Sequence, residues 1–160
     1  MSDEKKLAII ATKGTLDWAY PPFILASTAA ALGYETQIFF TFYGLQLVRK
    51  KLDLKVSPLG NPGMPMPMGM DKWFPVLFTA LPGMEGMMTT MMKKKMADKG
   101  VASLEDLREL CAEAEVKLIA CQMTVDLFDF EHSDFIDGLE FGGAATFFEF
   151  AGESDICLYI

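Results

Sequence analysis

Cys121 is the residue of this sequence whose type and position most clearly suggest chemistry. It follows the apolar run 116–120, which is typical of a strand buried on both faces of a parallel sheet. The residues after it, 122–128, predict a short helix or turn. We therefore expect Cys121 at the carboxyl end of a strand, close to unpaired backbone N–H groups. Ligands of open α/β sheets collect at that edge, and such N–H groups favour a negative charge by about 0.3–1 kcal/mol.

A thiolate at this edge would be a nucleophile, because the deprotonated form is the reactive form of cysteine. The alternative is that Cys121 is a small buried hydrophobe that ends a core strand, as most free cysteines are. Cys111 lies on the apolar face of an expected helix and is most simply a core residue. Cys157 lies in the expected last strand, where we predict a buried and inert thiol.

Three cysteines without a CxxC pair argue against a disulfide framework and fit a reducing cytoplasm. The only histidine, His132, lies in an acidic connection, where a surface residue is expected more often than a catalyst. A His-Cys zinc site and a Ser-His-Asp triad are therefore not supported. We expect no metal and no cofactor.

Strand and helix patterns alternate along the chain. Strands are expected at 6–12, 35–43, 116–120 and 155–160, with a short extended segment at 137–141. Helices are expected between the loop 13–15 and Gly33, and at 45–52, 104–114 and 144–151. This alternation predicts an α/β fold with a parallel sheet.

A methionine-rich insertion, residues 57–98, interrupts this alternation. In its first part, 57–70, methionines alternate with Pro and Gly, which excludes regular helix and central strand. Thioether ligation of Cu(I) is one interpretation. We favour an adaptable apolar loop, because no histidine or cysteine lies nearby and methionine fills irregular gaps.

The second part of the insertion contains twenty residues, 73–92, with Glu85 as the only charge. A transmembrane helix is disfavoured, because prolines and glycines interrupt the run and a central carboxylate costs about 2.5–3.5 kcal/mol on insertion scales. We expect two helices instead, 71–81 and 84–98. The second would carry five methionines on one face (Met84, Met87, Met88, Met91 and Met92), buried in the core, against another subunit or, least favoured, on a membrane surface.

Length and composition predict one folded domain, 1–160. The chain has 160 residues, of which 51% are hydrophobic and 22% charged. No hydrophobic segment typical of a signal peptide precedes the first strand, so we expect a cytoplasmic protein. Residues 101–160 hold 14 acidic and 2 basic residues, which disfavours binding to nucleic acid.

The sequence resembles the DsrE/DsrF-like family of small sulfur-carrier proteins, in particular the branch with a methionine-rich insertion that is often labelled DsrE-like or peroxiredoxin-family. The matching segments cover nearly the whole chain: LAIIATKGTLDWAYPPFILASTAAALGYE at 7–35, GNPGMPMPMGMDKWFP at 60–75, VKLIACQMTVDLF at 116–128 and DFIDGLEFGGAATFFEFA at 134–151.

The resemblance implies a flavodoxin-like three-layer sandwich with about five parallel strands, and a homo-oligomer, commonly a trimer or larger. It also implies a sulfurtransferase activity, in which Cys121 accepts sulfane sulfur as a persulfide and passes it to a partner thiol. A true peroxidase is not implied, because its site would need an arginine near the thiolate. Arg49 and Arg108, the only arginines, are distant from Cys121 in sequence.

We expect the backbone N–H groups of residues 122–124 to stabilise the persulfide anion. Gln122, Met123 and Thr124 are candidate lining residues, together with Thr12, Lys13 and Gly14 of the first loop. No resolving cysteine is evident, so donor and acceptor thiols must come from partner proteins or low-molecular-weight thiols. The alternative function is a scaffold without catalysis, which would dock an oligomer or a membrane complex through the methionine-rich insertion, with peripheral membrane contact.

Overall fold

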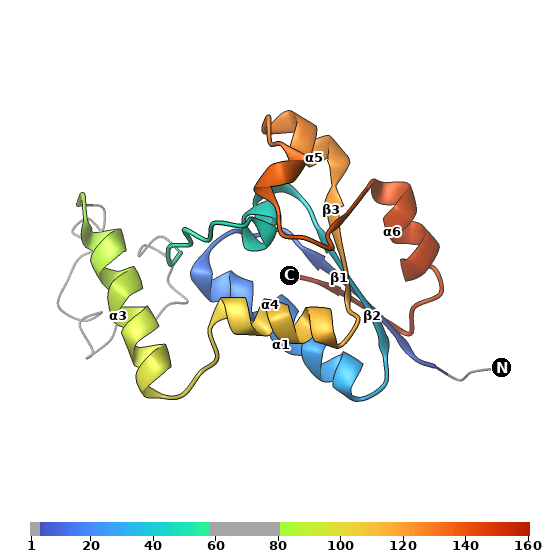
Figure 1. Ribbon diagram of the computed structural model, residues 1–160, viewed down its shortest axis with the longest axis horizontal. Coiled ribbons are helices and arrows are strands. Elements are labelled where there is room, and N and C mark those ends of the chain that lie inside the picture. Colours follow the sequence, from blue (N-terminus) through green and yellow to red (C-terminus); the bar gives the residue numbers. More distant parts are fainter. Residues whose placement is uncertain (1–3, 58–80) are drawn as a thin grey trace.

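A five-stranded parallel sheet forms the centre of the computed structural model, which describes residues 4–57 and 81–160 (Figure 1). The strands lie in the order β4-β3-β2-β1-β5. Their bounds are β1 Lys6–Ala11, β2 Glu35–Phe40, β3 Lys117–Cys121, β4 Glu140–Gly142 and β5 Ile156–Tyr159. The predicted α/β class with about five parallel strands is confirmed.

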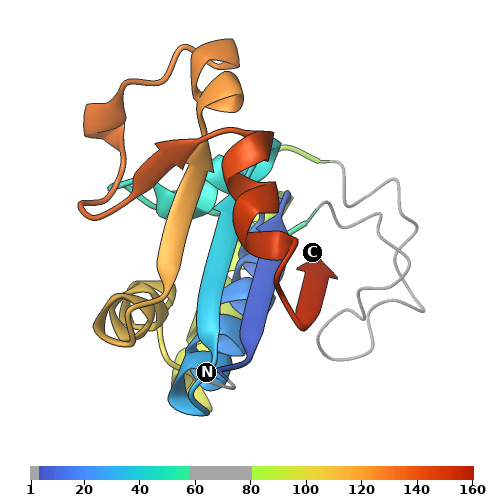
Figure 2. The ribbon, with the colours of Figure 1, turned by 90° about the vertical axis from the view of Figure 1, so that its right-hand side faces the viewer.

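Helices cover both faces of the sheet and make it the middle of three layers (Figures 1 and 2). Helices α1 (Leu16–Ala31) and α4 (Leu104–Glu113) pack together on one face, and α6 (Ala144–Ala151) lies on the other. The short α5 (Gln122–Leu127) follows β3 at the carboxyl edge of the sheet. Helix α3 (Met84–Asp98) lies to one side of these layers.

The pleat of the strands sorts the buried side chains into two clusters. Leu7, Ile9 and Ala11 of β1 belong to the larger cluster, with the helices α1 and α4. Ala8 belongs to a smaller cluster beneath α6. The members of this smaller cluster are Ala8, Phe39, Ile119, Cys121 and Phe147, with Ile10, Phe150 and Ala151 at its border.

The chain after β2 differs from the prediction of a strand to residue 43 and a helix at 45–52. The strand ends at Phe40, and a 3-10 helix, η1, spans Phe42–Val48. The chain turns at Phe42, where φ is 50°. Gly44 then packs on the end of β1 so closely that a Cβ would lie 2.1 Å from the carbonyl oxygen of Ala11. A larger residue at position 44 would clash with β1, so the tight turn after β2 requires glycine there.

Helix α3 confirms the predicted helix at 84–98, whereas the expected helix at 71–81 falls almost wholly outside the described residues. Its methionine face is only partly buried. Met88 packs in the core, Met91 and Met92 lie at its border, and Met87 is 49% exposed. No helix in the described ranges is long and apolar enough to cross a membrane.

Helix α4 begins with a capping box, as the sequence predicts. The Asp106 N–H donates to Ser103 Oγ at 3.1 Å, and the Ser103 N–H donates to Asp106 Oδ2 at 3.0 Å. Hydrogen bonds that the Asp106 carboxylate accepts from the side chain and backbone of Ser103 lower the pKa of Asp106. Leu110 lies exposed beside the buried Cys111.

Loss of this cap should destabilise the fold measurably. We expect Ser103→Ala to lower the free energy of unfolding by about 0.5–2 kcal/mol in urea denaturation, the usual effect of removing an N-cap. Ser27→Ala is the matched control, since its hydroxyl only donates to Ile24 within α1. Equal losses in the two variants would contradict the role of the cap.

The effect of Ser103→Ala should also depend on pH. A carboxyl whose pKa is lowered by folding contributes stability above its unfolded pKa, and this contribution disappears as the pH falls through its folded pKa. The gap in stability between the wild type and Ser103→Ala should therefore narrow in acid. A gap that stays constant down to the acid limit of folding would contradict this linkage.

Candidate functional site

Cys121 is the last residue of β3 and directly precedes α5, so the structure places it at the carboxyl edge of the sheet. Its partner in β4 is Gly142. The thiol points to the face that α6 covers, in the small cluster with Phe39, Ile119 and Phe147. The side chain is 5% exposed. The strand-end position expected from sequence is therefore present, and the sulfur is nearly covered.

Helix α6 provides the cover over this cluster. Phe147 is itself buried, and its ring centroid lies 5.4 Å from that of Phe39. Gly142 lets the helix approach the sheet, because a Cβ there would lie 2.9 Å from Thr146 Oγ1. Access to the sulfur therefore depends on how tightly Phe147 packs.

Thr124, expected to line the site, instead fastens α5 to the end of β2. Its side chain is fully buried. Thr124 Oγ1 lies 3.2 Å from Thr41 Oγ1 and accepts a hydrogen bond from the Phe42 N–H at 3.3 Å. Met123, the next residue toward Cys121, projects outward and is 63% exposed. Through these hydrogen bonds Thr124 holds α5, which directly follows Cys121, against the chain after β2. Met123 contributes to the outer surface.

Gln122 connects α5 to the chain after it. Its Nε2 donates to Asp126 Oδ1 at 2.7 Å, and its Oε1 lies 2.9 Å from His132 Nε2. The imidazole of His132 stacks on Phe141, with 3.7 Å between centroids and 8° between planes. Gln122 is thus held by Asp126 on α5 and by His132 on the 3-10 helix η3 (His132–Asp134).

Sequence reasoning missed this role of His132. His132 is exposed, as expected, but its ring stacks on Phe141. Phe141 directly precedes Gly142, which is the β4 partner of Cys121. The spacing of Gln122 and Asp126 four residues apart on one helix was a readable signal for their contact. The contact with His132 had no such signal, because the loop after α5 must first fold back.

The loop 12–14 lies at the same carboxyl edge but lines a separate cavity. Thr12 Oγ1 donates to the Ile160 carbonyl at 3.1 Å, and Lys13 Nζ lies 3.4 Å from the centroid of the Trp18 ring. Gly14 packs against Tyr43, whose carbonyl oxygen a Cβ at this position would meet at 2.4 Å. Lys13, Gly14, Trp18 and Tyr43 border a cavity of about 310 Å³ that Cys121 does not line.

The two other cysteines differ sharply from each other. Cys111 is fully buried in α4, and burial raises the pKa of its thiol to about 11. Cys157 is exposed, which corrects the prediction of a buried residue. It lies on β5, an edge strand, and pairs with Ala8. Its side chain therefore lies on the face of α6, where α6 packs over Phe39 and Ile119 and leaves Cys157 uncovered.

The possible metal ligands of the described residues are scattered over the fold. Within this part of the chain, no group of three or more His, Cys, Asp or Glu residues is arranged to hold an ion.

Comparison with known proteins gives consistent results. The model of the DsrE/DsrF/DrsH-like family matches residues 3–159. The chain is 80% identical over 158 residues to "Sulfur carrier protein DsrE2" of Allochromatium vinosum, covering 99% of each chain. It is 33% identical over 159 residues to "Uncharacterized protein YrkE" of Bacillus subtilis (strain 168), covering 98% of this chain and 97% of that one.

A solved structure shares the fold. The crystal structure of the ychN protein from E. coli superimposes with a TM-score of 0.54 at 12% sequence identity, and the match covers 98% of this chain and 99% of that one. The match of the family model and the two relatives extend over almost all of the sequence, including the segment around Cys121. The chain therefore belongs to the DsrE/DsrF/DrsH-like family.

Proposed function

We propose that this protein is a sulfur carrier, which accepts sulfane sulfur as a persulfide on Cys121 and passes it to a partner thiol. The observation that carries the proposal is the 80% identity over 99% of the chain to a protein named sulfur carrier. The position of Cys121 at the carboxyl edge of the sheet agrees with it, because α/β proteins bind and transform ligands at this edge.

The transfer consists of two thiol exchanges. The Cys121 thiolate attacks the outer sulfur of a donor persulfide, whose S–S bond breaks and releases the donor thiolate. Cys121 then carries the sulfur as a persulfide, a reversible modification of cysteine. An acceptor thiolate attacks the outer sulfur in turn and releases the Cys121 thiolate. No external oxidant or reductant is needed, because one S–S bond forms for each one that breaks.

The start of α5 offers donors for a negative charge on the carried sulfur. The backbone N–H groups of residues 122–124 begin α5 directly after Cys121, and the Cys121 side chain does not cap them. Preorganised N–H groups stabilise a localised negative charge without further rearrangement. Gln122 is held by Asp126 and His132, which fixes the first turn of α5 beside the sulfur.

Cys121 is favoured over the other cysteines for physical reasons. Cys111 is excluded as a carrier by complete burial and by its raised pKa, which keep it protonated at neutral pH. Cys157 is accessible, but it lies within the edge strand β5 and not at its carboxyl end. Cys121 combines a strand end with a helix start, and this combination supports its assignment.

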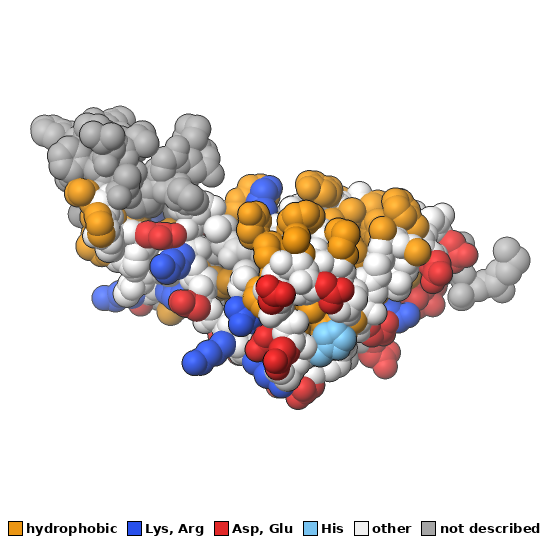
Figure 3. All heavy atoms as spheres, turned by 90° about the horizontal axis from the view of Figure 1, so that it is seen from above, with side chains coloured by type: hydrophobic (Ala, Val, Ile, Leu, Met, Phe, Trp, Pro, Cys, Tyr) orange, Lys and Arg blue, Asp and Glu red, His pale blue; other side chains and the backbone are white. Residues whose placement is uncertain are grey.

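Partner proteins would dock around the carboxyl edge. Hydrophobic side chains gather on the face that carries α5 (Figure 3). Tyr43, Met123 and Leu127 contribute large exposed apolar groups there. Aromatic residues and methionine are enriched in the interfaces of protein complexes. We place the carrier in the cytoplasm, where thiols stay reduced.

A homo-oligomer, a trimer or larger, is part of the same proposal. Among the described residues β5 is an edge strand, and Ile156 and Tyr159 on it are exposed. Exposed apolar edge strands are surfaces that another chain commonly covers. Light scattering coupled to size exclusion measures the subunit number.

Persulfide formation is the first test. Protein incubated with polysulfide should gain about 32 Da, the mass of one sulfur atom, by intact mass spectrometry. Cys121→Ser should lose this gain, whereas Cys157→Ser should keep it. Cys111→Ser tests whether the buried thiol takes part, and no effect is expected. If the added mass persists in Cys121→Ser and disappears in Cys157→Ser, the site is misassigned. If no variant takes up sulfur, the scaffold alternative gains support.

Access to the sulfur is the second test. With iodoacetamide at pH 8, we expect Cys157 to react first and Cys121 more slowly, because Cys121 is almost covered. Cys111 should react only after unfolding, because a pKa of about 11 leaves it protonated. Peptide mapping over time gives the three rates separately.

The cover over Cys121 is tested by Phe147→Leu, which should raise the alkylation rate of Cys121 several-fold by loosening the packing of α6. Phe148→Leu is the matched control, because Phe148 is the neighbouring residue and is 67% exposed. Equal rates in both variants would show that Phe147 does not limit access.

A further inference from the structure

A second cavity lies on the face of α6, toward the amino end of β3. Its volume is about 220 Å³. Gln37 of β2, Lys117 of β3, Glu140 of β4, and Thr146 and Glu149 of α6 line it. The volume is below the roughly 300–1,000 Å³ of pockets for drug-sized ligands. The cavity therefore suits a small ligand.

Gln37 gives the clearest indication that the cavity binds something. Its side chain is 2% exposed, and its Nε2 has no hydrogen-bond partner among the described residues. A buried amide donor in a native protein nearly always has a partner, from the protein or from a bound molecule. An acceptor oxygen in the cavity would satisfy this donor.

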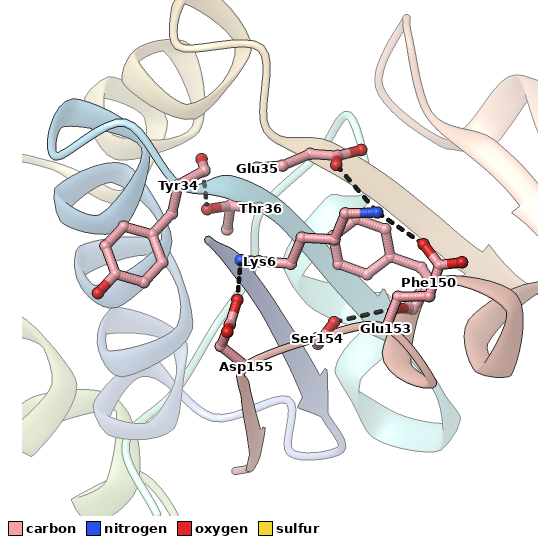
Figure 4. A network of polar contacts seen from close by, with 8 residues as sticks. All are labelled: Lys6, Tyr34, Glu35, Thr36, Phe150, Glu153, Ser154 and Asp155. Carbon is pink, nitrogen blue, oxygen red and sulfur yellow. Dashed lines mark hydrogen bonds and ion pairs between the residues drawn. The ribbon is translucent and has the colours of Figure 1, made fainter. Parts of the chain in front are cut away.

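One wall of the cavity is held by a network of charges. Lys6 Nζ lies 2.9 Å from Glu153 Oε2 and 3.5 Å from Glu35 Oε2, and it extends across the ring of Phe150 at 5.6 Å from the centroid (Figure 4). The Lys6 N–H also donates to Asp155 Oδ2 at 2.8 Å. The charge of Lys6 is thus already paired with carboxylates.

The remaining charges of the cavity are available to a ligand. Lys117, Glu140 and Glu149 form no ion pair with any residue in 4–57 or 81–160. The cavity therefore presents one ammonium and two carboxylates, together with the unpaired Gln37 amide. A ligand that carries both an ammonium and a carboxylate would complement all of them, whereas a simple anion would be repelled by the two glutamates.

We propose that this cavity binds a short peptide-like thiol that carries both charges on its first residue, such as a γ-glutamyl thiol tripeptide. Its ammonium faces Glu140 and Glu149, its carboxylate faces Lys117, and one of its oxygens accepts from Gln37 Nε2. The thiol in this assignment rests on the proposed sulfur-carrier function. The amphoteric ligand class rests on the cavity alone.

The strand geometry sets the length of the ligand. Lys117, Ile119 and Cys121 alternate onto the same face of β3, and a strand rises about 3.3 Å per residue, so about 13 Å separates the level of Lys117 from that of Cys121. An extended residue spans about 3.5 Å, and three residues span about 10 Å. Thr146 lines the cavity and also touches Gly142, the partner of Cys121. A tripeptide therefore covers most of the rise toward Cys121, which a single amino acid does not, and its approach to the sulfur requires Phe147 to move aside.

Nuclear magnetic resonance of the whole wild-type protein labelled with ¹⁵N tests this inference. The probe is S-methylglutathione, which has the charges of a thiol tripeptide but cannot form disulfides or persulfides. We expect a saturable shift of the Gln37 side-chain amide signals at millimolar or lower probe. Binding should weaken at least tenfold in Lys117→Gln and in Glu149→Gln, whose side chains are exposed and whose loss should leave the fold intact.

The matched control is Glu113→Gln, a surface glutamate on α4 across the sheet, which should bind the probe like the wild type. S-methylcysteine, with both charges but one residue, should bind more weakly than the tripeptide. Equal binding of the two probes would overturn the length assignment. Gln37 signals that do not move would mean that an internal water alone satisfies the amide, and would overturn the site.

Two outcomes distinguish a failure of the proposed binding site in the cavity from a failure of the proposed carrier function. Sulfur loading of Cys121 from inorganic polysulfide without binding of S-methylglutathione refutes the cavity and leaves the carrier function intact. Binding of the probe without any loading of Cys121 refutes the carrier function and leaves an amphoteric peptide site.

Discussion

The pairing of β3 with β4 is the constraint on which the site depends. It places Gly142 opposite Cys121, and a single residue, Gly143, then separates β4 from α6. Because Gly142 has no side chain, Thr146 in the first turn of α6 can lie directly on the strand. The helix therefore packs down onto β3, and Phe147 closes over the thiol. A larger residue at 142 would lift α6 and open the cluster that contains Cys121.

The three cysteine thiols lie in three different environments, and each environment determines how accessible the sulfur is. Cys111 is surrounded by apolar side chains, and its Sγ donates only to the Phe23 carbonyl at 3.6 Å, so the charged form is disfavoured. Cys157 faces water on an edge strand, where nothing positions a reacting partner. Cys121 lies between these extremes, at the boundary of a small core and a helix start. A carrier needs such a boundary, because the sulfur must be protected in transit and yet be reached by two partners.

The order of strands and helices could be predicted from the sequence because each depends on local patterns. The apolar runs gave the strands, and Ser103 with Asp106 marked the start of α4. The exposure of Cys157 could not be predicted, because it depends on β5 being an edge strand, which is a property of the topology. The turn at Phe42 was also missed, since it results from the packing of Gly44 on β1.

Two features of the candidate site could be predicted from the sequence, namely the position of Cys121 at the end of a strand and the carboxyl edge of the sheet on which it lies. Cys121 was expected at a strand end, where it lies. The expected lining residues Thr12, Lys13 and Gly14 do reach the same edge, but Thr12 bonds to the Ile160 carbonyl, Lys13 lies over Trp18, and Gly14 packs against η1. A strand that is buried on both faces has apolar side chains on both, so its sequence does not alternate. The sheet face onto which Cys121 projects therefore could not be predicted from its own strand.

That direction follows from the pleat, which links the two ends of β3. Since side chains alternate, Cys121 shares its face with Ile119 and Lys117, and the neighbouring strands add Gln37 and Glu140 in register. A slip of one residue would move the thiol to the face of α1 and α4 and separate it from the charged cavity. The face of α6 is thus polar at the amino end of β3 and apolar in the middle, and it carries the Cys121 thiol at the carboxyl end. A ligand bound by its charges at one end would be aligned with the strand, and its far end would be directed toward the sulfur.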